Sequence, residues 1–360
     1  MNASAPPHTD LFKTLTITGI KDEAPNVKTF YFEGAEAREI AYQSGQYLTF
    51  LLPHHQPEVR RSYSIVASPV LNEPLAIGVK RMENGIFSRY LIDHAKVGDK
   101  LITTGAAGFF TLPENLALYK QLFFLAAGSG ITPIFSLIKT VLFSHPKLPV
   151  VLIYSNKTHD HAIFREELIQ LADQFPQRFK VEFLFSDAAD LTKARLYKGL
   201  LETFVKVLAK APPSEILAYV CGPENYMRMC TYGLHMAGVK LENIRKENFS
   251  TQKVQLKITP PDTTPHLVTL KLNHQEFTFQ SRFPDTILQA AKKAGLTMPY
   301  SCEAGKCGSC AARCTSGKTW MSYNEVLTEK EVANGLTLTC TAYPVGGNVT
   351  LEIALPALTL

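Results

Sequence analysis

The chain has 360 residues, 46% of them hydrophobic, so it can bury several cores and is long enough for two or three domains. Lysine and arginine number 37 against 32 acidic residues, and the formal charge of +5 comes without long basic runs, so nucleic acid is not expected as a partner. The first residues, MNASAPPHTDLF, lack the features of a secretory signal, which predicts a cytoplasmic protein.

The first hundred residues predict an antiparallel β barrel. Between about 11 and 112, short apolar runs such as VKTFYFEG and QYLTFLLP alternate with turns rich in Gly, Pro and Asn. Residues 8–113 are therefore expected to form the first domain.

From residue 121 onward, strands alternate with helices, which predicts an α/β domain with a doubly wound parallel sheet over residues 114–250. The most apolar stretch, residues 122–143, is long enough to suggest a membrane span. However, Gly128, Gly130 and Pro133 interrupt it, and Lys139 lies inside it. A buried strand, a turn and a helix explain this stretch better, so no membrane is expected as a partner.

A stretch rich in Pro and Thr, residues 251–265, predicts a linker before a third domain over residues 266–360. In this domain LVTLKLNHQEFTFQ predicts a hairpin around Asn273 and His274. The segment PDTILQAAKKAG predicts a helix that begins at Asp285 or Thr286 and ends at Gly295.

Four cysteines carry the strongest chemical signal in the chain. Four residues separate Cys302 from Cys307, two separate Cys307 from Cys310, and 29 separate Cys310 from Cys340. This is the spacing of plant-type [2Fe-2S] centres, in which four thiolates hold two irons. The sequence therefore predicts these four residues as ligands of an iron–sulfur cluster.

Two glycines in the same loop, Gly305 and Gly308, would let it curl so that backbone N–H groups face the sulfides. A structural zinc site is the alternative, although zinc sites usually come as paired C-x2-C knuckles, and free thiols are another. Cys314 lies four residues past the third ligand and is expected to be a packed thiol. Cys221 and Cys230 lie far away in the second domain and are expected to have no cluster role.

In the first domain, Arg61, Ser62, Tyr63 and Ser64 lie in one expected strand whose edge can cradle a flavin. Arg61 and Tyr63 would project to one side and the two serines to the other. A bound isoalloxazine requires a cation for the phosphate, an aromatic face for the ring and a hydroxyl near the reactive nitrogen. The pattern alone is weak, because any surface strand can carry it by chance.

A glycine turn, Gly128-Ser-Gly130-Ile-Thr132-Pro133, joins the first strand of the α/β domain to its first helix. Two glycines permit a tight turn, and the helix N-terminus attracts a pyrophosphate. Pro133 suits the first helical turn and takes the place of the third glycine in the usual dinucleotide pattern. The sequence thus predicts pyridine-nucleotide binding at this turn.

Cys221, Gly222 and Pro223 end a later strand, at the carboxyl edge where open α/β sheets bind ligands, although a buried thiol is the alternative for Cys221. Lys157 follows the second strand of this domain, where no carboxylate is present for the ribose hydroxyls. It could face a 2′-phosphate, which favours NADPH, or it could be a solvated charge, which would leave NADH possible. Arg165 could help the same phosphate or pair with acids on its own helix.

The segments CEAGKCGSCAARCTSG and LTCTAYP resemble the ferredoxin domain at the C-terminus of oxygenase reductases. This resemblance implies a β-grasp-like α+β fold for the third domain. The R-x-Y-S strand, Gly85-Ile-Phe-Ser88 and Gly105-Ala-Ala-Gly108-Phe109 together resemble the ferredoxin reductase superfamily. That resemblance favours FAD over FMN and makes the segment from Gly85 to Ser88 the pyrophosphate-binding turn.

The superfamily resemblance also implies roles for single residues. Arg61 would bind the flavin phosphate, Tyr63 would stack on the ring and Ser64 would face N5. Cys221, with the glycine after it, would lie beside the nicotinamide, so the catalytic residues are expected to be Tyr63, Ser64 and Cys221. Phe249 is a weaker candidate for shielding the flavin, and it could equally be a core phenylalanine.

The order of the three domains, together with YSNK, IFREEL and CGPENYM, makes the whole chain resemble the reductase subunits of phenylacetyl-CoA epoxidase systems, which feed electrons to a separate di-iron oxygenase. This resemblance implies FAD, a [2Fe-2S] cluster, NADPH or NADH, and an oxygenase that docks transiently. Two alternatives are a reductase for a ring-hydroxylating dioxygenase or other hydroxylase, and a redox-sensing regulatory module.

Overall fold

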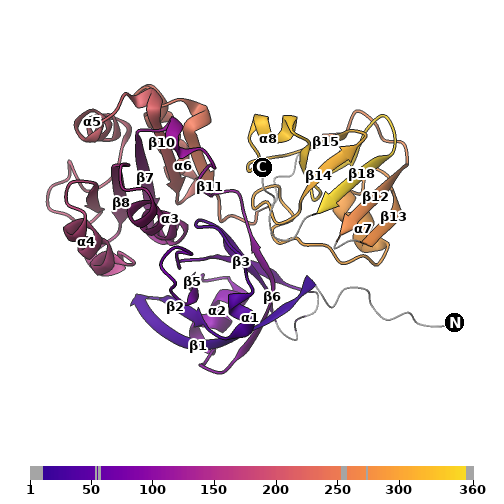
Figure 1. The fold of residues 1–360 in the computed structure, drawn as a ribbon, viewed down its shortest axis with the longest axis horizontal. Coiled ribbons are helices and arrows are strands. Elements are labelled where there is room, and N and C mark those ends of the chain that lie inside the picture. Colours follow the sequence, from indigo (N-terminus) through magenta and orange to yellow (C-terminus); the bar gives the residue numbers. More distant parts are fainter. Residues whose placement is uncertain (1–10, 53–54, 56–57, 253–257, 273–274, 354–360) are drawn as a thin grey trace.

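The computed structural model describes residues 11–52, 55, 58–252, 258–272 and 275–353 and arranges them in three domains (Figure 1). Each domain is built on its own sheet, and the expected order of barrel, α/β domain and C-terminal α+β domain is confirmed. The predicted turn at Asn273 and His274 lies outside the described residues.

Six antiparallel strands form the barrel domain: β1 (Lys13–Ala24), β2 (Val27–Phe32), β3 (Tyr47–Leu51), β4 (Arg60–Ser64), β5 (Leu75–Lys80) and β6 (Lys100–Ala107). Their order is β4-β3-β6-β1-β2-β5, and a bridge between Ile65 and Ile77 joins the two ends of the sheet into a barrel. The helices α1 (Ala35–Arg38) and α2 (Ile86–Asp93) accompany it, and α2 buries Phe87 and Leu91 in the core.

The α/β domain has five parallel strands: β7 (Gln121–Ala127), β8 (Val150–Asn156), β9 (Phe179–Phe185), β10 (Ile216–Cys221) and β11 (Ile244–Glu247). Their order is β11-β10-β7-β8-β9, and β11 is a strand that the sequence did not predict. Helices α3 (Ile131–Ser144) and α4 (Arg165–Gln174) pack on one face, and α5 (Lys198–Leu208) and α6 (Glu224–Met236) pack on the other. Because helices cover both faces, the inner strands β7, β8 and β10 are buried along almost their whole length.

The C-terminal domain has a mixed sheet of β12 (His266–Leu272), β13 (Gln275–Ser281), β14 (Ala311–Ser316), β16 (Leu336–Leu338) and β18 (Val349–Ile353), in the order β13-β12-β18-β14-β16. A ribbon of β15 (Thr319–Met321) and β17 (Ala342–Pro344) and the helices α7 (Ile287–Lys293) and α8 (Glu329–Ala333) complete it. Of the two predicted helix starts, Thr286 is the N-cap of α7, since its hydroxyl accepts from the backbone N–H of Gln289 and the Gln289 side chain accepts in return.

The barrel and α/β domains share one hydrophobic core. The buried side chains of the barrel and of the α3 and α4 face of the parallel sheet form one cluster, in which Ile77 and Val79 of the barrel join Ile134 and Leu137 of α3. The face covered by α5 and α6 has a second cluster. The C-terminal domain has a separate core of its own, built around the central strands β12 and β18. The first two domains are therefore one packing unit, and the third is held to them by a narrower set of contacts.

The apolar stretch at residues 122–143 forms β7, a turn and α3, as the sequence predicted. Within the described ranges, no helix has the length and apolar character needed to cross a bilayer. Lys139, the charged residue of this stretch, places its Nζ 2.5 Å from Oε1 of Glu73 on the barrel. Burial lowers the pKa of Lys139, and the nearby Glu73 carboxylate opposes that shift. Because Lys139 belongs to α3 and Glu73 to the barrel, the ion pair joins the two across their shared core.

Replacement of Glu73 by alanine should destabilise the protein by about 2 kcal/mol, because it leaves the buried Lys139 ammonium without its partner. Calorimetric unfolding measures this as a lower melting temperature. The double variant Glu73→Ala/Lys139→Met should recover much of the loss, since neither charge then remains buried alone. Equal losses in the single and double variants would contradict this account.

Candidate functional site

The four predicted ligand cysteines lie together at one end of the C-terminal domain. Cys302, Cys307 and Cys310 occupy the loop between α7 and β14, and Cys340 follows β16. Their thiols lie in two pairs, Cys302 beside Cys307 and Cys310 beside Cys340. Two pairs suit two irons that take two thiolates each, whereas zinc needs its ligands around one ion. Among the described residues, no group of three or more potential ligands surrounds a single point.

The loop has the glycine geometry that the sequence predicted. Gly305 and Gly308 adopt φ values of +70° and +82°, a region that favours glycine. A Cβ on Gly308 would lie only 2.8 Å from the ring of Phe109 in the barrel domain. The backbone N–H of Ala304 points at the sulfur of Cys302 over 3.4 Å. Such donors stabilise thiolates, so the residues present fit an iron–sulfur cluster.

The other cysteines lie away from these pairs. Cys314, half-buried on β14, donates to the carbonyl of Ser316 over 3.3 Å, as expected of a packed thiol. Cys221 ends β10, and Cys230 is buried on α6. Burial raises the pKa of both of these thiols.

Strand β4 presents its predicted residues on two faces. Arg61 and Tyr63 alternate with Ser62 and Ser64 along the pleat. The Tyr63 ring lies edge-on to Phe87 of α2, with the ring centroids 5.9 Å apart, so this face of β4 adjoins the first turn of α2. Burial raises the pKa of the Tyr63 phenol, which stays neutral.

The turn before α2 is shaped by Gly85 and Ser88. The Ser88 hydroxyl donates to the Gly85 carbonyl and accepts from the N–H of Met82, both over 3.1 Å. A Cβ on Gly85 would lie 2.4 Å from that hydroxyl, so only glycine fits. The hydroxyl is thus engaged within the turn, and the N–H groups of the first turn of α2 are the groups available to an anion.

The other face of β4 meets the cysteine loop. The Ser62 hydroxyl donates to Oγ of Ser301 over 2.8 Å, which places Ser62 at the contact between domains. Tyr47, opposite Ser64 on β3, donates its hydroxyl to the carbonyl of Cys307. The sequence did not single out Tyr47, because its partner lies 260 residues away along the chain.

The two predicted nucleotide turns meet at the point where the order of the parallel sheet reverses, between β7 and β10. A Cβ on Gly130 would lie 2.1 Å from the carbonyl oxygen of Cys221, and a Cβ on Gly222 would lie 2.9 Å from Cβ of Ala127. Both turns therefore need glycine. Pro223 is the N-cap residue of α6, which starts beside them. Ligands of open α/β sheets bind in the crevice at such a reversal.

The α3 turn also adjoins the barrel. The Thr132 hydroxyl donates to the carbonyl of Ser129 over 2.9 Å. Its methyl group packs on β5, where a Cβ on Gly78 would lie 2.6 Å from it. Gly128 adopts φ +53°, and a Cβ there would lie 3.9 Å from Nζ of Lys80. Thr132 thus shapes the turn and its contact with the barrel.

Two lysines from different domains converge near this turn. Burial and the nearby Lys157 cation lower the pKa of Lys80, which ends β5. The amide of Asn156, the last residue of β8, and Nε of Arg165, the first residue of α4, are buried without a hydrogen-bond partner in the described part of the chain. Buried polar groups usually have partners, so the Asn156 amide fits a polar ligand at the end of β8. Lys80 was missed because the barrel sequence gives no signal for it.

Comparisons with known proteins agree with this geometry. Residues 14–112 match the oxidoreductase FAD-binding domain, residues 124–231 the oxidoreductase NAD-binding domain, and residues 270–345 the 2Fe-2S iron-sulfur cluster binding domain. The chain is 30% identical to the E subunit of 1,2-phenylacetyl-CoA epoxidase from Escherichia coli, over 95% of this chain and 97% of that protein. The chain belongs to the FAD- and NAD-binding oxygenase reductases with a C-terminal [2Fe-2S] ferredoxin domain.

A second relative of this reductase is the ferredoxin reductase component of 3-ketosteroid-9-alpha-monooxygenase from Mycobacterium tuberculosis, 30% identical over 93% of this chain and 94% of that protein. The solved structure of phthalate dioxygenase reductase has the same fold, with a TM-score of 0.60 and 23% identity over 97% of this chain and all of that one. The reductase is an NAD(P)H-dependent oxidoreductase that transfers electrons through FAD and a [2Fe-2S] cluster. The zinc and free-thiol alternatives are therefore wrong.

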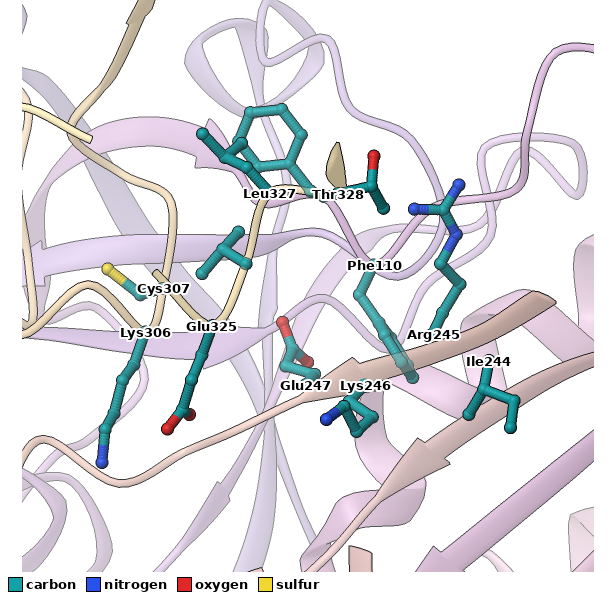
Figure 2. A pocket seen from close by; sticks show the side chains of 12 residues that line it. Phe110, Ile244, Arg245, Lys246, Glu247, Lys306, Cys307, Glu325, Leu327 and Thr328 are labelled. Atoms are coloured by element: carbon teal, nitrogen blue, oxygen red, sulfur yellow. The ribbon is translucent and has the colours of Figure 1, made fainter. Parts of the chain in front are cut away.

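All three domains of the reductase meet at one cavity of about 170 Å³ (Figure 2). It is lined by Phe110 of the barrel domain, Glu247 at the end of β11 and Cys307 of the cluster loop. Burial, with Cys307 as a second cause, raises the pKa of Glu247 to about 8. Oε2 of this carboxyl has no hydrogen-bond partner among the described residues.

Phe249 lies just beyond this junction and is 47% exposed, so it is not a core phenylalanine. The preceding residue, Asn248, donates to Oε2 of Glu325 in the ferredoxin domain over 2.9 Å. The end of the nucleotide domain is thereby held beside the cluster domain.

Replacement of Cys340 by serine should abolish the cluster, because it removes one of the two thiols of a pair. Iron and acid-labile sulfide should fall from about two atoms of each per chain to a small fraction of that. Cys314→Ser is the matched control and should retain both. Loss of iron in the Cys314 variant, or its retention in the Cys340 variant, would show that the ligand set is wrong.

Proposed function

We propose that this reductase takes electrons from NADPH and delivers them to a separate oxygenase of the phenylacetyl-CoA epoxidase type. Support comes from the similarity to the E. coli epoxidase protein along nearly its whole length. The order of the three domains and the segments YSNK, IFREEL and CGPENYM add to it.

The observation that carries the electron-transfer part is the contact between β4 and the cluster loop. The hydrogen bond from Ser62 to Ser301 joins the strand that bears Tyr63 and Ser64 to the residue directly before Cys302. When bound, the flavin accepts a hydride from the nicotinamide and releases its electrons one at a time, and the cluster accepts them singly. Such a bridge suits electron transfer within the chain better than a sensing module.

For the flavin, we assign the Arg61 guanidinium to the phosphate, the Tyr63 ring to the isoalloxazine and Ser64 to N5. Support comes from the shared face of Arg61 and Tyr63 and from the proximity of Tyr63 to the first turn of α2. That turn, shaped by Gly85 and Ser88, would bind the pyrophosphate through its N–H groups.

For the pyridine nucleotide, we assign the turn of Gly128, Gly130 and Thr132 to the pyrophosphate. Cys221, with Gly222 and Pro223 after it, would lie beside the nicotinamide, where its neutral thiol packs without contributing charge. Phe249 would shield the flavin until the nucleotide enters, which its exposure allows. No general base is required, because a hydride carries its own electron pair.

We assign Lys157 to the 2′-phosphate of NADPH, with Lys80 supplying a second cation. The argument rests on charge: two lysines converge near one turn, and the end of β8 offers no carboxylate for an NADH ribose. Two ammonium groups that repel each other are better neutralised by an additional phosphate than by a ribose hydroxyl.

The Lys157→Ala variant should raise KM for NADPH roughly tenfold through loss of one charge-assisted contact, with little change in kcat or in KM for NADH. Steady-state reduction of ferricyanide with each nucleotide measures this. Lys147→Ala, an exposed lysine before β8, is the control and should change neither constant. Equal effects on NADPH and NADH would remove Lys157 from the 2′-phosphate site.

The acceptor can be tested by reconstitution. The reductase should support NADPH-dependent epoxidation of phenylacetyl-CoA by a purified epoxidase oxygenase component, and the Cys340→Ser variant should not. The ketosteroid monooxygenase oxygenase component is the competing acceptor, since its reductase has the same 30% identity to this chain. If the reductase supported turnover of the ketosteroid oxygenase and not of the epoxidase, its physiological acceptor would be assigned to the hydroxylase alternative. Slow NADPH-dependent reduction of cytochrome c would favour the sensing alternative.

A further inference from the structure

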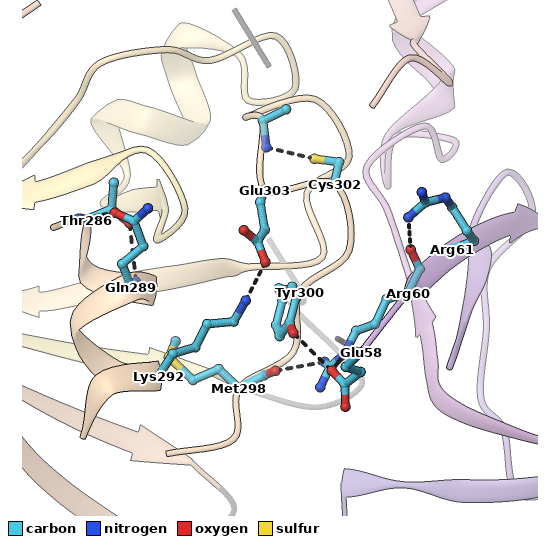
Figure 3. Close-up of polar contacts among 11 residues, drawn as sticks. Glu58, Arg60, Arg61, Thr286, Gln289, Lys292, Met298, Tyr300, Cys302 and Glu303 are labelled. Atoms are coloured by element: carbon cyan, nitrogen blue, oxygen red, sulfur yellow. Dashed lines mark hydrogen bonds and ion pairs between the residues drawn. The ribbon is translucent and has the colours of Figure 1, made fainter. Parts of the chain in front are cut away.

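Arg60, the residue before the flavin-facing Arg61, turns toward the ferredoxin domain (Figure 3). It is 4% exposed, and its guanidinium donates to the carbonyl of Met298 over 3.0 Å. The same guanidinium lies 3.9 Å from the ring centroid of Tyr300 and is bound to Glu58 over 2.7 Å. These three contacts and the burial hold the Arg60 side chain in one conformation.

The Tyr300 ring receives a second cation from its own domain. Nζ of Lys292 lies 3.6 Å from the ring centroid, and Lys292 is also paired with Glu303. Two cations so close to one centroid fit only on opposite faces of the ring, and Figure 3 shows Tyr300 between them. The Tyr300 hydroxyl donates to Glu58 over 2.9 Å, which is a further link between the ferredoxin domain and the barrel domain.

These contacts lie beside the cluster. Tyr300 and Ser301 directly precede Cys302. Arg60 and Ser62 occupy the same face of β4 by alternation, and their partners are consecutive along the loop. The strand and the loop are thus joined at two adjacent points, within two residues of a cluster ligand.

We propose that Arg60 is a positioning residue that clamps the ferredoxin domain on β4 and thereby sets the rate at which electrons cross from the flavin to the cluster. Each crossing moves one electron from reduced flavin to oxidised cluster, with NAD(P)H as the source of the pair, and Arg60 exchanges neither proton nor electron. The inference rests on the proposed placement of the flavin on the Arg61 face of β4.

The clamp depends on the chemistry of arginine. A planar guanidinium can stack on Tyr300 and donate in its own plane to Met298 and Glu58, whereas a lysine ammonium offers no such plane. The separate core of the ferredoxin domain makes this contact important, because Phe109 is the one barrel side chain that packs against that core among the described residues.

The test compares Arg60→Ala, Arg60→Lys and Tyr300→Ala with Arg282→Ala, an exposed arginine of the ferredoxin domain, as control. Stopped-flow mixing of each loaded reductase with NADPH follows flavin and cluster bleaching separately. Hydride transfer to the flavin should be unchanged, and cluster reduction should slow roughly tenfold in the first three variants. Small-angle X-ray scattering should give a larger radius of gyration for the same three, and the control should match the wild type in every measurement.

Wild-type cluster reduction and an unchanged radius of gyration in the Arg60 variants would overturn the proposal. If Arg60→Ala does not retain its cluster, Arg60→Lys and Tyr300→Ala decide the matter by the same two readouts. The flavin content of the variants distinguishes a failure of the Arg60 proposal from a failure of the proposed flavin site. Loss of flavin should follow Arg61→Ala and not Arg60→Ala, and flavin retained in Arg61→Ala would contradict the assignment instead.

Discussion

The pleat of one five-residue strand, β4, organises the electron-transfer centre of this reductase. Successive side chains of a strand point to opposite sides, so Arg61 and Tyr63 face the first turn of α2 while Arg60 and Ser62 face the cluster loop. The flavin site that we propose and the cluster loop therefore lie on opposite faces of the same strand. A slip of one residue in this register would exchange both faces at once.

Close backbone approaches hold the remaining parts in place. Gly130 lets the nucleotide turn lie against the carbonyl of Cys221, and Gly308 lets the cluster loop lie against Phe109. In each case a single Cβ would push apart two segments that belong to different parts of the site. Glycine is required at both positions because the neighbouring segment leaves no room for a Cβ. At Gly308 glycine is also favoured because the backbone is in the left-handed region.

Local patterns in the sequence were sufficient for much of this architecture. The spacing of the four cysteines identified the cluster, and apolar runs separated by turns identified the barrel. Tyr47, Lys80 and Arg60 were missed because their partners belong to other domains, and periodicity does not encode how domains dock. Ser62 was grouped with the flavin residues because it sits in their motif, yet its hydroxyl is bound to Ser301. Similarly, Ser88 and Thr132 were grouped with the cofactor-binding turns, and in the structure their hydroxyls form hydrogen bonds within those turns.

The division of the hydrophobic cores bears on how such a chain can change over evolutionary time. The barrel and the nucleotide domain are interleaved in one core, so neither could be exchanged by recombination without exposing apolar surface of the other. The ferredoxin domain closes its own core and touches the rest through polar groups, the ring of Tyr300 and the packing of Phe109 against that core. A gene fusion or a domain swap at this boundary would need to preserve only a few complementary side chains. The segment between β11, which ends at Glu247, and β12, which begins at His266, is thus the point at which an exchange of domains would disturb the packing least.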